Sequence, residues 1–501
     1  MNKLLRTSLT CNSQRNFVFS TLFLILLVVG ASAQQSVVRF AKPTVYPSGG
    51  GWLYGIAVAD VNGDGHPDII TANLCDSQWD CGDIKFATGK VGVLLGNGDG
   101  TFQPAVSYSS GGYNAYSVAV ADVNGDGHPD LIVANNCATS DCNSGSIGVL
   151  LGNGDGTFQP AVGYNSGGNA MYVAVGDTRG NGRLDIVAST CLFAYGSSCE
   201  YGTGTLSVLL GNGDGTFQPA VMYSTGGPDA GSIAIGDLNR DGKGDVVLAN
   251  DNDQVGVLLS NGDGTFQAAV SYTGPGPSAL ADVNGDGDLD IVGVGAVLLG
   301  NGDGTFQAQI EYPASGYAAA AGDLNGGAPD VAVATGMIRG RHSYGLVQAL
   351  GGVGDGTFEA PVTYKDGCDN GGTFSIAIAD LNGDNRGDVV GGNWGCDSVA
   401  VLLNILSVKS TIALRGSPNP SQLNESVTFT ATISSNPPVP DGEVIAFYSG
   451  AKILGMGTTS GGIAALTTSF AQAKTYAIRA GFAGDPYHKP STGRLKQVVN
   501  P

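Results

Sequence analysis

Seven copies of an acidic nine-residue motif, short apolar runs broken by glycine, and a change of composition near residue 405 predict an all-β chain. The expected fold is a seven-bladed β-propeller followed by an immunoglobulin-like β-sandwich. We place a signal peptide at residues 1–33, the propeller at 34–405 and the sandwich at 406–501.

The first 33 residues have the pattern of an export signal. Lys3, Arg6 and Arg15 precede an apolar run of 14 residues at 17–30, and small residues at 31–33 supply a cleavage site. The run is shorter than the roughly 20 residues that span a bilayer, which leaves an uncleaved anchor as the alternative. We expect a secreted or cell-surface protein without a transmembrane span in the mature chain.

The chain is sparsely charged and acidic. Charged residues make up 13% of its 501 residues, against about 25% in ordinary domains, and its formal net charge is −20. Contact with phosphates needs clusters of lysine and arginine, so nucleic acid is not an expected partner.

Eight cysteines follow the leader, an even number in an exported chain. Zinc is the rival interpretation, but CxxC spacing is absent and the short loops between these cysteines lack histidine. The spacing predicts the disulfide pairs Cys75–Cys81, Cys137–Cys142, Cys191–Cys199 and Cys368–Cys396.

The acidic motif begins at residues 60, 122, 177, 237, 282, 323 and 380. An apolar run precedes each copy and a β-rich run follows it; a "GNGDGTF"-like segment then gives a strong hairpin signal. Each repeat therefore predicts four antiparallel strands, A to D, with the acidic motif as the A–B turn. Seven such repeats fit a propeller better than a linear solenoid, which needs capping repeats.

The two ends of the predicted propeller indicate how the ring closes. The seventh repeat ends at residues 398–404 without a D strand, and "FAKPTVYPSGG" at 40–50 resembles the D strands of the other repeats. We expect residues Phe40–Tyr46 to pair with the strand around Val401.

The acidic loops offer side-chain oxygens at positions 1, 3, 5 and 9, with glycine at position 6 in most copies. Such donors suit Ca²⁺, a hard cation that takes oxygen ligands. An EF-hand is excluded because position 12 is never glutamate and the flanks have the pattern of strands. A plain Asx turn is the alternative, although it leaves the aspartate retained at position 9 unexplained.

These loops and the "LLGNGDGTF" runs resemble the FG-GAP or VCBS-type repeats of bacterial secreted proteins and of the integrin α-subunit head, over about residues 37–405. The resemblance implies about five Ca²⁺ sites on the lower face of a propeller. Blade 3 departs from the pattern because Arg179 stands where an oxygen ligand is expected, and blade 6 has lost one loop residue. The implied ligands are Asp60, Asn62, Asp64, Asp68, Asp122, Asn124, Asp126, Asp130, Asp237, Asn239, Asp241, Asp245, Asp282, Asn284, Asp286, Asp290, Asp380, Asn382, Asp384 and Asp388.

The connections on the opposite face carry aromatic residues together with all eight mature cysteines. Loops braced in this way suit stacking against a sugar or anchoring a protein. The alternative is that the rings only cap the channel or pack on neighbouring loops. The candidate ligand-binding residues are Trp52, Trp79, Tyr113, Tyr195, Tyr344 and Trp394.

The segment 406–501 alternates strand-like runs with proline and glycine turns. Its "SPNPS" and "SVTFTATIS" stretches resemble bacterial Ig-like domains, which implies a spacing or tethering role.

The sequence favours a secreted, calcium-stabilised binding or adhesion protein with an extracellular glycan or protein as its ligand. The alternatives are a polysaccharide-degrading lyase or hydrolase and a purely structural surface component. The four histidines are scattered, and neither a G-x-S-x-G nor an HExxH motif occurs. We therefore expect no enzyme and assign no catalytic residue.

Overall fold

A computed structural model gives the fold of the chain. It describes residues 38–501 except 77–80, 82–86, 192–203, 228–229, 251–252, 340–341, 370, 406–408, 436–437 and 485–487. Within these limits every named element is a β-strand, and the strands form sheets within residues 44–402 and within residues 411–500.

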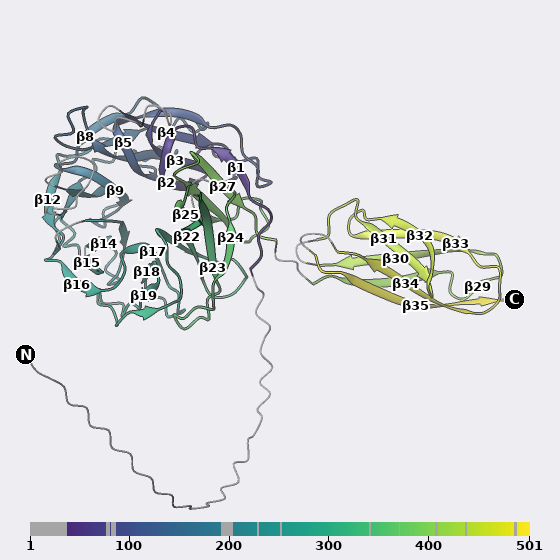
Figure 1. The fold of residues 1–501 in the computed structure, drawn as a ribbon. Helices are drawn as coiled ribbons and strands as arrows, with labels where there is room; N and C mark the ends of the chain where they lie inside the picture. Colours follow the sequence, from purple (N-terminus) through teal and green to yellow (C-terminus); the bar gives the residue numbers. More distant parts are fainter. Residues whose placement is uncertain are drawn as a thin grey trace, which may run out of the picture. The chain divides into compact units, whose positions relative to one another are not determined.

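Residues 44–402 form seven antiparallel four-stranded blades around a central axis (Figure 1). Blades 1 and 2 share the long strand β5 (Val106–Ala121), which is strand D of blade 1 and strand A of blade 2. The other strands of blade 1 are β2 (Gly51–Ala59), β3 (Asp68–Cys75) and β4 (Thr88–Leu94), and those of blade 2 are β6 (Asp130–Cys137), β7 (Ser146–Leu150) and β8 (Val162–Asn165).

The next four blades repeat the order A to D from the channel outwards. Blade 3 is β9 (Asn169–Gly176), β10 (Asp185–Cys191), β11 (Gly204–Leu209) and β12 (Val221–Ser224). Blade 4 is β13 (Ile233–Gly236), β14 (Asp245–Asn250), β15 (Gln254–Leu258) and β16 (Val270–Thr273). Blade 5 is β17 (Pro277–Ala281), β18 (Asp290–Gly293), β19 (Ala296–Leu298) and β20 (Ile310–Glu311). Blade 6 is β21 (Ala318–Gly322), β22 (Asp330–Arg339), β23 (His342–Leu350) and β24 (Val362–Lys365).

Blade 7 draws its strands from both ends of the propeller, as the sequence predicts. It consists of β25 (Thr373–Ala379), β26 (Asp388–Asn393), β27 (Ser398–Leu402) and β1 (Thr44–Pro47). In the β1–β27 pair, Thr44 lies opposite Val401 and Tyr46 opposite Val399. The predicted closure of the ring is therefore confirmed.

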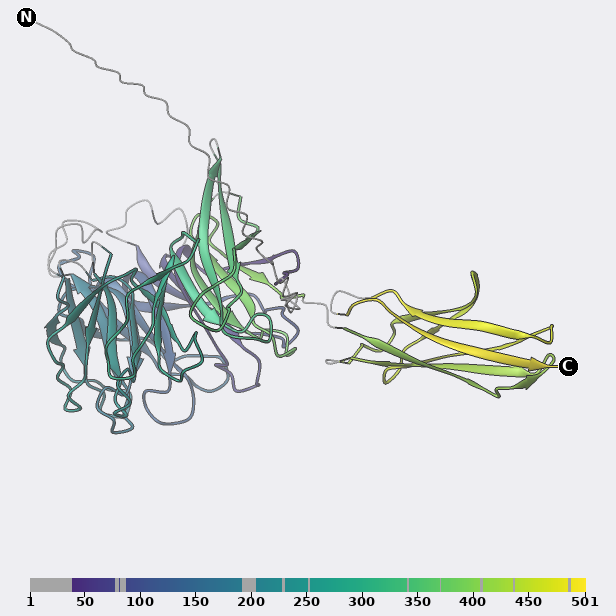
Figure 2. The same ribbon diagram turned by 90° about the horizontal axis from the view of Figure 1, so that it is seen from below.

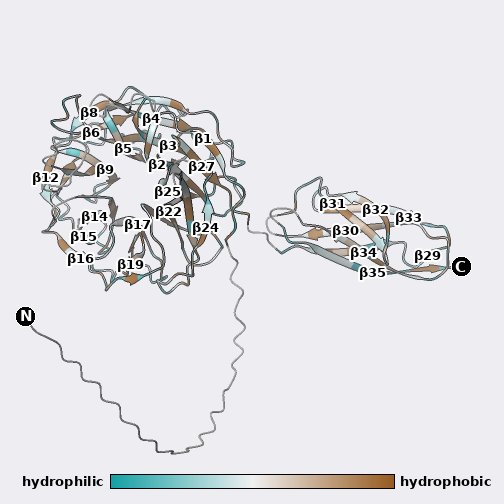
Figure 3. Ribbon diagram, in the orientation of Figure 1, coloured by the Kyte–Doolittle hydropathy of each residue, from teal (hydrophilic) through white to brown (hydrophobic). Residues whose placement is uncertain are grey.

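The core of the propeller lies between the blades. Among the described residues, seven apolar layers each join two neighbouring blades. The layer that joins blades 7 and 1 packs Val390 and Val401 against Leu53 and Ile69. Figure 3 shows the apolar residues gathered in the strands. The junction between blades 7 and 1, which closes the ring, thus buries apolar side chains as every other junction between blades does.

An outer belt of aromatic pairs repeats this arrangement. The phenylalanine after each "GDGT" turn or its counterpart packs edge-to-face on a tyrosine of the preceding blade, with ring centroids 5.0–5.6 Å apart. The pairs are Tyr46–Phe102, Tyr108–Phe158, Tyr164–Phe217, Tyr223–Phe266, Tyr272–Phe306, Tyr312–Phe358 and, at the closure, Tyr364–Phe40.

The blades alternate their turns between two faces. We call the face with the acidic A–B loops and the C–D turns the lower face, and the face with the B–C loops and D–A connections the upper face. Strands β22 and β23 of blade 6 extend beyond the other strands (Figure 2), and their paired register runs out to Arg339 opposite His342.

The second group of strands forms a β-sandwich. One sheet holds β28 (Thr411–Ser417), β30 (Ser426–Ser434) and β33 (Ile463–Ser469). The other holds β29 (Ser421–Gln422), β35 (Ser491–Asn500), β34 (Thr475–Phe482), β31 (Val444–Ser449) and β32 (Lys452–Thr458). Phe429 and Phe447, one from each sheet, are fully buried in the shared core. The predicted fold class is confirmed for both parts of the chain.

Candidate functional site

The acidic loop of blade 1 is a compact turn held by its own side chains. Asp60 accepts hydrogen bonds from the backbone N–H of Gly63 at 2.7 Å and of Gly65 at 2.8 Å. Asn62 Oδ1 accepts from the N–H of Asp64 at 3.0 Å, and Asn62 Nδ2 donates to Asp64 Oδ2 at 3.0 Å. These are the bonds of an Asx turn, and they place three of the predicted ligands within one short loop.

In each of the other six loops the carboxylate at position 1 again accepts a hydrogen bond from a backbone N–H. In the five loops that match the pattern fully, positions 1 and 3 are half-buried and position 9 is fully buried. The position-1 residues of the other loops are Asp122, Asp177, Asp237, Asp282, Asp323 and Asp380.

The aspartate at position 9 ties two turns of the lower face together. Asp68 accepts from the N–H of Val61 in its own loop at 2.8 Å and from the N–H of Gly96 in the C–D turn at 2.7 Å. Sequence reasoning left a plain turn without an explanation for this residue; the structure gives it a structural role that needs no metal. The same two kinds of bond are made by Asp130, Asp245, Asp290, Asp330 and Asp388.

Burial makes these carboxylates costly to ionise. It raises the pKa of Asp245, Asp290 and Asp330 to about 6 and that of Asp388 to about 7, and the other aspartates of each loop add to the rise. The pKa values of Asp68 and Asp130 are raised for the same reasons. A cation in the loop would oppose both effects.

The loops fit Ca²⁺ by the kind of donor they offer. At positions 1, 3, 5 and 9 of the five matching loops the side chains present only carboxylate and amide oxygens, which are the ligands this ion takes. In the described part of the chain, however, no group of three or more histidine, cysteine, aspartate or glutamate side chains is placed to hold a metal ion. To coordinate Ca²⁺, the side chains would have to turn from the backbone N–H groups towards a common centre.

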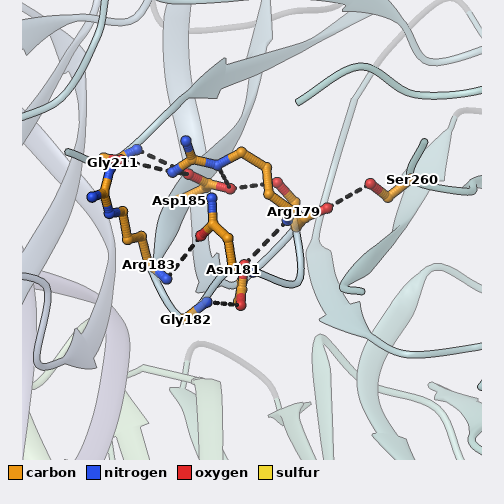
Figure 4. Close-up of polar contacts among 9 residues, drawn as sticks. Arg179, Asn181, Gly182, Arg183, Asp185, Gly211 and Ser260 are labelled. Carbon is orange, nitrogen blue, oxygen red and sulfur yellow. Dashed lines mark hydrogen bonds and ion pairs between the residues drawn. The ribbon is translucent and has the colours of Figure 1, made fainter. Parts of the chain in front are cut away.

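Blade 3 replaces the position-3 oxygen with a positive charge. Arg179 Nη2 lies 2.7 Å from Oδ1 of the buried Asp185, Arg179 Nε donates to Asp185 Oδ2 at 3.2 Å, and Nη2 also donates to the carbonyl of Gly211 at 2.6 Å (Figure 4). Among the described residues, Asp185 is the only position-9 aspartate with an ion pair. The arginine therefore places a positive charge directly beside the position-9 carboxylate of this loop.

In blade 6 the buried position-9 carboxylate accepts a hydrogen bond from a neutral side-chain donor instead of an arginine. Its shortened loop brings Asn325 Nδ2 to 2.8 Å from Asp330 Oδ1, whereas Asn62 of blade 1 points its amide at Asp64 instead. The two loops that depart from the sequence pattern thus each supply a position-3 donor to the buried carboxylate. This difference between the loops was not visible in the sequence.

The structure brings two of the candidate ligand-binding residues together on the upper face. The rings of Trp52 and Trp394, from blades 1 and 7, lie 5.3 Å apart. The backbone N–H of Trp52 donates a hydrogen bond to Asp397 Oδ1 at 2.7 Å. Trp52 has a backbone φ of 54°, which is rare for a bulky residue. Tyr113 lies on β5 and Tyr344 on β23. Lys365 Nζ lies 4.9 Å from the centre of the Tyr344 ring. Trp79 and Tyr195 lie outside the described residues.

The disulfide prediction is confirmed over the zinc alternative. Cys75–Cys81, Cys137–Cys142 and Cys368–Cys396 are disulfides. Cys191 is also disulfide-bonded, while its predicted partner Cys199 lies outside the described residues.

Sequence reasoning missed a set of residues on the inner strands. A cavity of about 430 Å³ is lined by strand A residues of all seven blades, including Tyr54, Tyr116, Tyr317 and Phe374. Each of these four stands six residues before the first aspartate of its acidic loop. That shared spacing is the signal that could have identified them.

The part of the chain that the structure describes contains no helix long and apolar enough to cross a membrane. The predicted export signal at residues 1–33 lies outside that part.

Comparison with known proteins gives matches for both parts of the chain. The FG-GAP-like repeat matches residues 83–133, 137–188, 193–248 and 237–293, and the FG-GAP repeat matches 52–73. The bacterial Ig-like domain (group 3) matches residues 414–500. No curated protein matches the chain.

Two similar solved structures show an extracellular domain from B. thetaiotaomicron, described in one as that of a one-component system and in the other as that of a hybrid two-component system. They are 12% and 13% identical to this chain, each with a TM-score of 0.40. The matches cover 93% of this chain and 58% and 60% of the other chains, so this chain spans less than two thirds of their length. On the family matches, the chain is an FG-GAP repeat protein that carries a bacterial Ig-like domain after its repeats.

Proposed function

We propose that this chain is an exported, calcium-stabilised and non-catalytic binding protein whose ligand, a glycan or a protein, meets the upper face of the propeller. FG-GAP repeats together with an Ig-like domain indicate an extracellular binding or structural protein. Of these two roles, we favour ligand binding by a propeller that calcium stabilises, on the basis of two features of the described residues.

The calcium part of the proposal rests on the buried position-9 carboxylates. Blade 3 balances Asp185 with Arg179, whereas no position-9 aspartate of the five matching loops has an ion pair within the described chain. The ion pairs that these loops do make, Lys243–Asp241 and Arg240–Asp288, lie at other positions. The ligands would be the aspartates and asparagines at positions 1, 3, 5 and 9 of those loops, and the bound ion would supply the positive charge that the position-9 carboxylates lack. With the Kd of about 10⁻⁴–10⁻³ M typical of extracellular calcium modules, calcium at about 1 mM adds roughly 0.4–1.4 kcal/mol per site.

The observation that carries the binding part is the backbone of Trp52. A φ of 54° costs about 1–3 kcal/mol for such a residue and persists only where surrounding contacts impose it. Here Asp397 of blade 7 accepts a hydrogen bond from the backbone N–H of Trp52, and the indole ring of Trp52 packs on the ring of Trp394. Both rings stay half-exposed beside the Cys75–Cys81 and Cys368–Cys396 disulfides. Strain of this kind clusters at ligand clamps.

The experiment is a screen of glycans and polysaccharides against the chain from Gln34 to Pro501 in calcium buffer, with product analysis on every binder. Binding without turnover, weakened by Trp394→Ala, supports the proposal. The matched control is Val353→Ala, a 53% exposed side chain in a C–D turn of the lower face, which should bind as the wild type does.

Two results would contradict the proposal. Turnover of a polysaccharide would favour the enzyme alternative, because it requires groups that act on a bond rather than only hold a sugar. Absence of both binding and turnover, in a folded protein, would favour a structural role. Thermal unfolding of each variant shows whether it is folded.

A further inference from the structure

The inner strands enclose a cavity of about 430 Å³ at the upper end of the channel. It lies within the roughly 300–1,000 Å³ typical of small-molecule sites. None of the 16 described residues that line it is charged. Its walls are aromatic rings, short apolar side chains and serines.

Irregular strand pairing aims aromatic rings into this cavity. In β2 the register with β3 shifts between Leu53 and Gly55, which leaves Tyr54 as the extra residue of a bulge. The same shift leaves Tyr116 unpaired in β5 and Phe374 unpaired in β25. Bulges re-aim side chains and are enriched next to functional sites. In the described strands, five blades thus have a bulge in strand A: those of blades 1, 2 and 7 carry an aromatic residue, and those of blades 3 and 5 carry Met171 and Ser278.

The aromatic wall is continuous from blade 6 to blade 2. Tyr317 stacks on Phe374 at 4.3 Å with an interplanar angle of 10°, Phe374 lies 6.1 Å from Tyr54, and Tyr54 lies 4.7 Å from Tyr116. Burial, with a smaller contribution from Tyr54 and Tyr172, raises the pKa of Tyr116 above its usual range. The phenol groups of blades 1, 2 and 3 thus lie near one another.

The wall across from blade 1 offers small hydroxyl groups. Blades 4 and 5 contribute Ser232 and Ser278 where the other side has rings. Ser375 of blade 7, next to Phe374 in the aromatic wall, also lines the cavity, but its hydroxyl oxygen is fully buried and has no hydrogen-bond partner among the described residues.

We propose that this cavity binds a neutral sugar ring, with the C–H face of the sugar on the aromatic wall and its hydroxyl groups on Ser232 and Ser278. Tyr317, with a relative exposure of 57%, is the most accessible ring and forms the platform. The inference rests on the proposed function, since it names the ligand class and a seat for it at the upper face.

The lining argues against charged ligands. An acidic sugar or a phosphate would need a lysine or arginine in the wall, and none of the described lining residues is either. A quaternary ammonium ion would want ring faces on several sides, as in an aromatic cage. Here Tyr317 and Phe374 cover each other's faces, and the far wall is made of serine.

The test titrates the chain from Gln34 to Pro501 with neutral hexoses, pentoses and 6-deoxyhexoses and their methyl glycosides, and in parallel with uronic acids and with choline. A neutral sugar should bind, and Tyr317→Ala should weaken its Kd about tenfold or more, as expected for loss of an aromatic anchor. Tyr317→Phe should bind within about threefold of the wild type, because the ring and not its hydroxyl forms the platform.

Met337→Ala is the matched control, since it removes a 44% exposed side chain of blade 6 that does not line the cavity. Tyr344→Ala tests the other candidate residues of the upper face, because Tyr344 does not line the cavity either. Neutral-sugar binding that Tyr344→Ala abolishes and Tyr317→Ala leaves intact would overturn the cavity while sparing the proposed function. Binding of choline or uronic acids alone would also overturn it. If no neutral sugar binds, this inference fails; only a failure of the wider glycan screen as well removes the proposed function.

Discussion

Arg179 Nη2 lies 2.7 Å from Oδ1 of Asp185, a carboxylate with no exposed surface. Among the seven acidic loops, this is the one whose third residue is neither asparagine nor aspartate. The pairing makes blade 3 an internal comparison for the other loops, because it shows the position-9 carboxylate with a fixed positive charge beside it.

Removing that charge should destabilise the propeller. Arg179→Met leaves Asp185 buried without its partner, so we expect a loss of about 3–5 kcal/mol in the free energy of unfolding, measured with denaturant. Arg183→Met in the same loop removes an exposed arginine and should change stability by less than about 0.5 kcal/mol. Equal stability of the two variants would contradict the role of Arg179.

Arg179→Asn should convert blade 3 into a loop of the matching kind. In chelator the variant should lose about as much stability as Arg179→Met, because both leave Asp185 uncompensated. Added calcium should restore the asparagine variant and not the methionine variant, since only asparagine offers an oxygen ligand. Thermal unfolding with and without calcium measures the difference, and an equal response of both variants would count against a cation in these loops.

The closure of the ring should be as strong as any other junction between blades. Phe40 is 8% exposed and packs on Tyr364, while Phe158 is 7% exposed and makes the corresponding contact with Tyr108. Phe40→Ala and Phe158→Ala should therefore each cost about 3–5 kcal/mol. A cost below about 1 kcal/mol for Phe40→Ala alone would indicate that the first strand does not hold the ring closed.

Asp330 should make stability fall as the pH rises. Burial raises its pKa from 3.8 to about 6, so the folded state keeps a proton that the unfolded chain releases. Its contribution is complete below about pH 4 and is lost as the pH rises through about 6. Relative to Asp330→Asn, the wild type should lose roughly 2–4 kcal/mol between pH 4 and pH 7 in chelator. A constant difference across this range would show that Asp330 titrates as it does in the unfolded chain.

The propeller architecture could be predicted because short sequence patterns that mark strands and turns recur in every repeat. Asparagine–glycine and aspartate–glycine turns mark the ends of the strands, and the spare strand at 40–50 matches the one missing after residue 404. Local turn chemistry and alternation suffice for such features.

The sites were less predictable because they depend on contacts distant in sequence. The bond from the N–H of Gly96 to Asp68 crosses 28 residues, and it gives position 9 a role that the loop alone does not reveal. The bulge at Tyr54 depends on the register of β2 against β3. In the sequence, Arg179 shows only that blade 3 lacks an oxygen ligand at position 3. The structure shows that its guanidinium provides a positive charge at Asp185, because the loop folds the side chain back onto that carboxylate.

Calcium uptake by the chain from Gln34 to Pro501, titrated by calorimetry after chelation, tests the central claim most directly. Five loops match the pattern fully, so about five equivalents should bind and the melting temperature should rise markedly. No uptake would contradict the account and leave the acidic loops as hydrogen-bonded turns, with their buried aspartates serving only to join the A–B loops to the C–D turns.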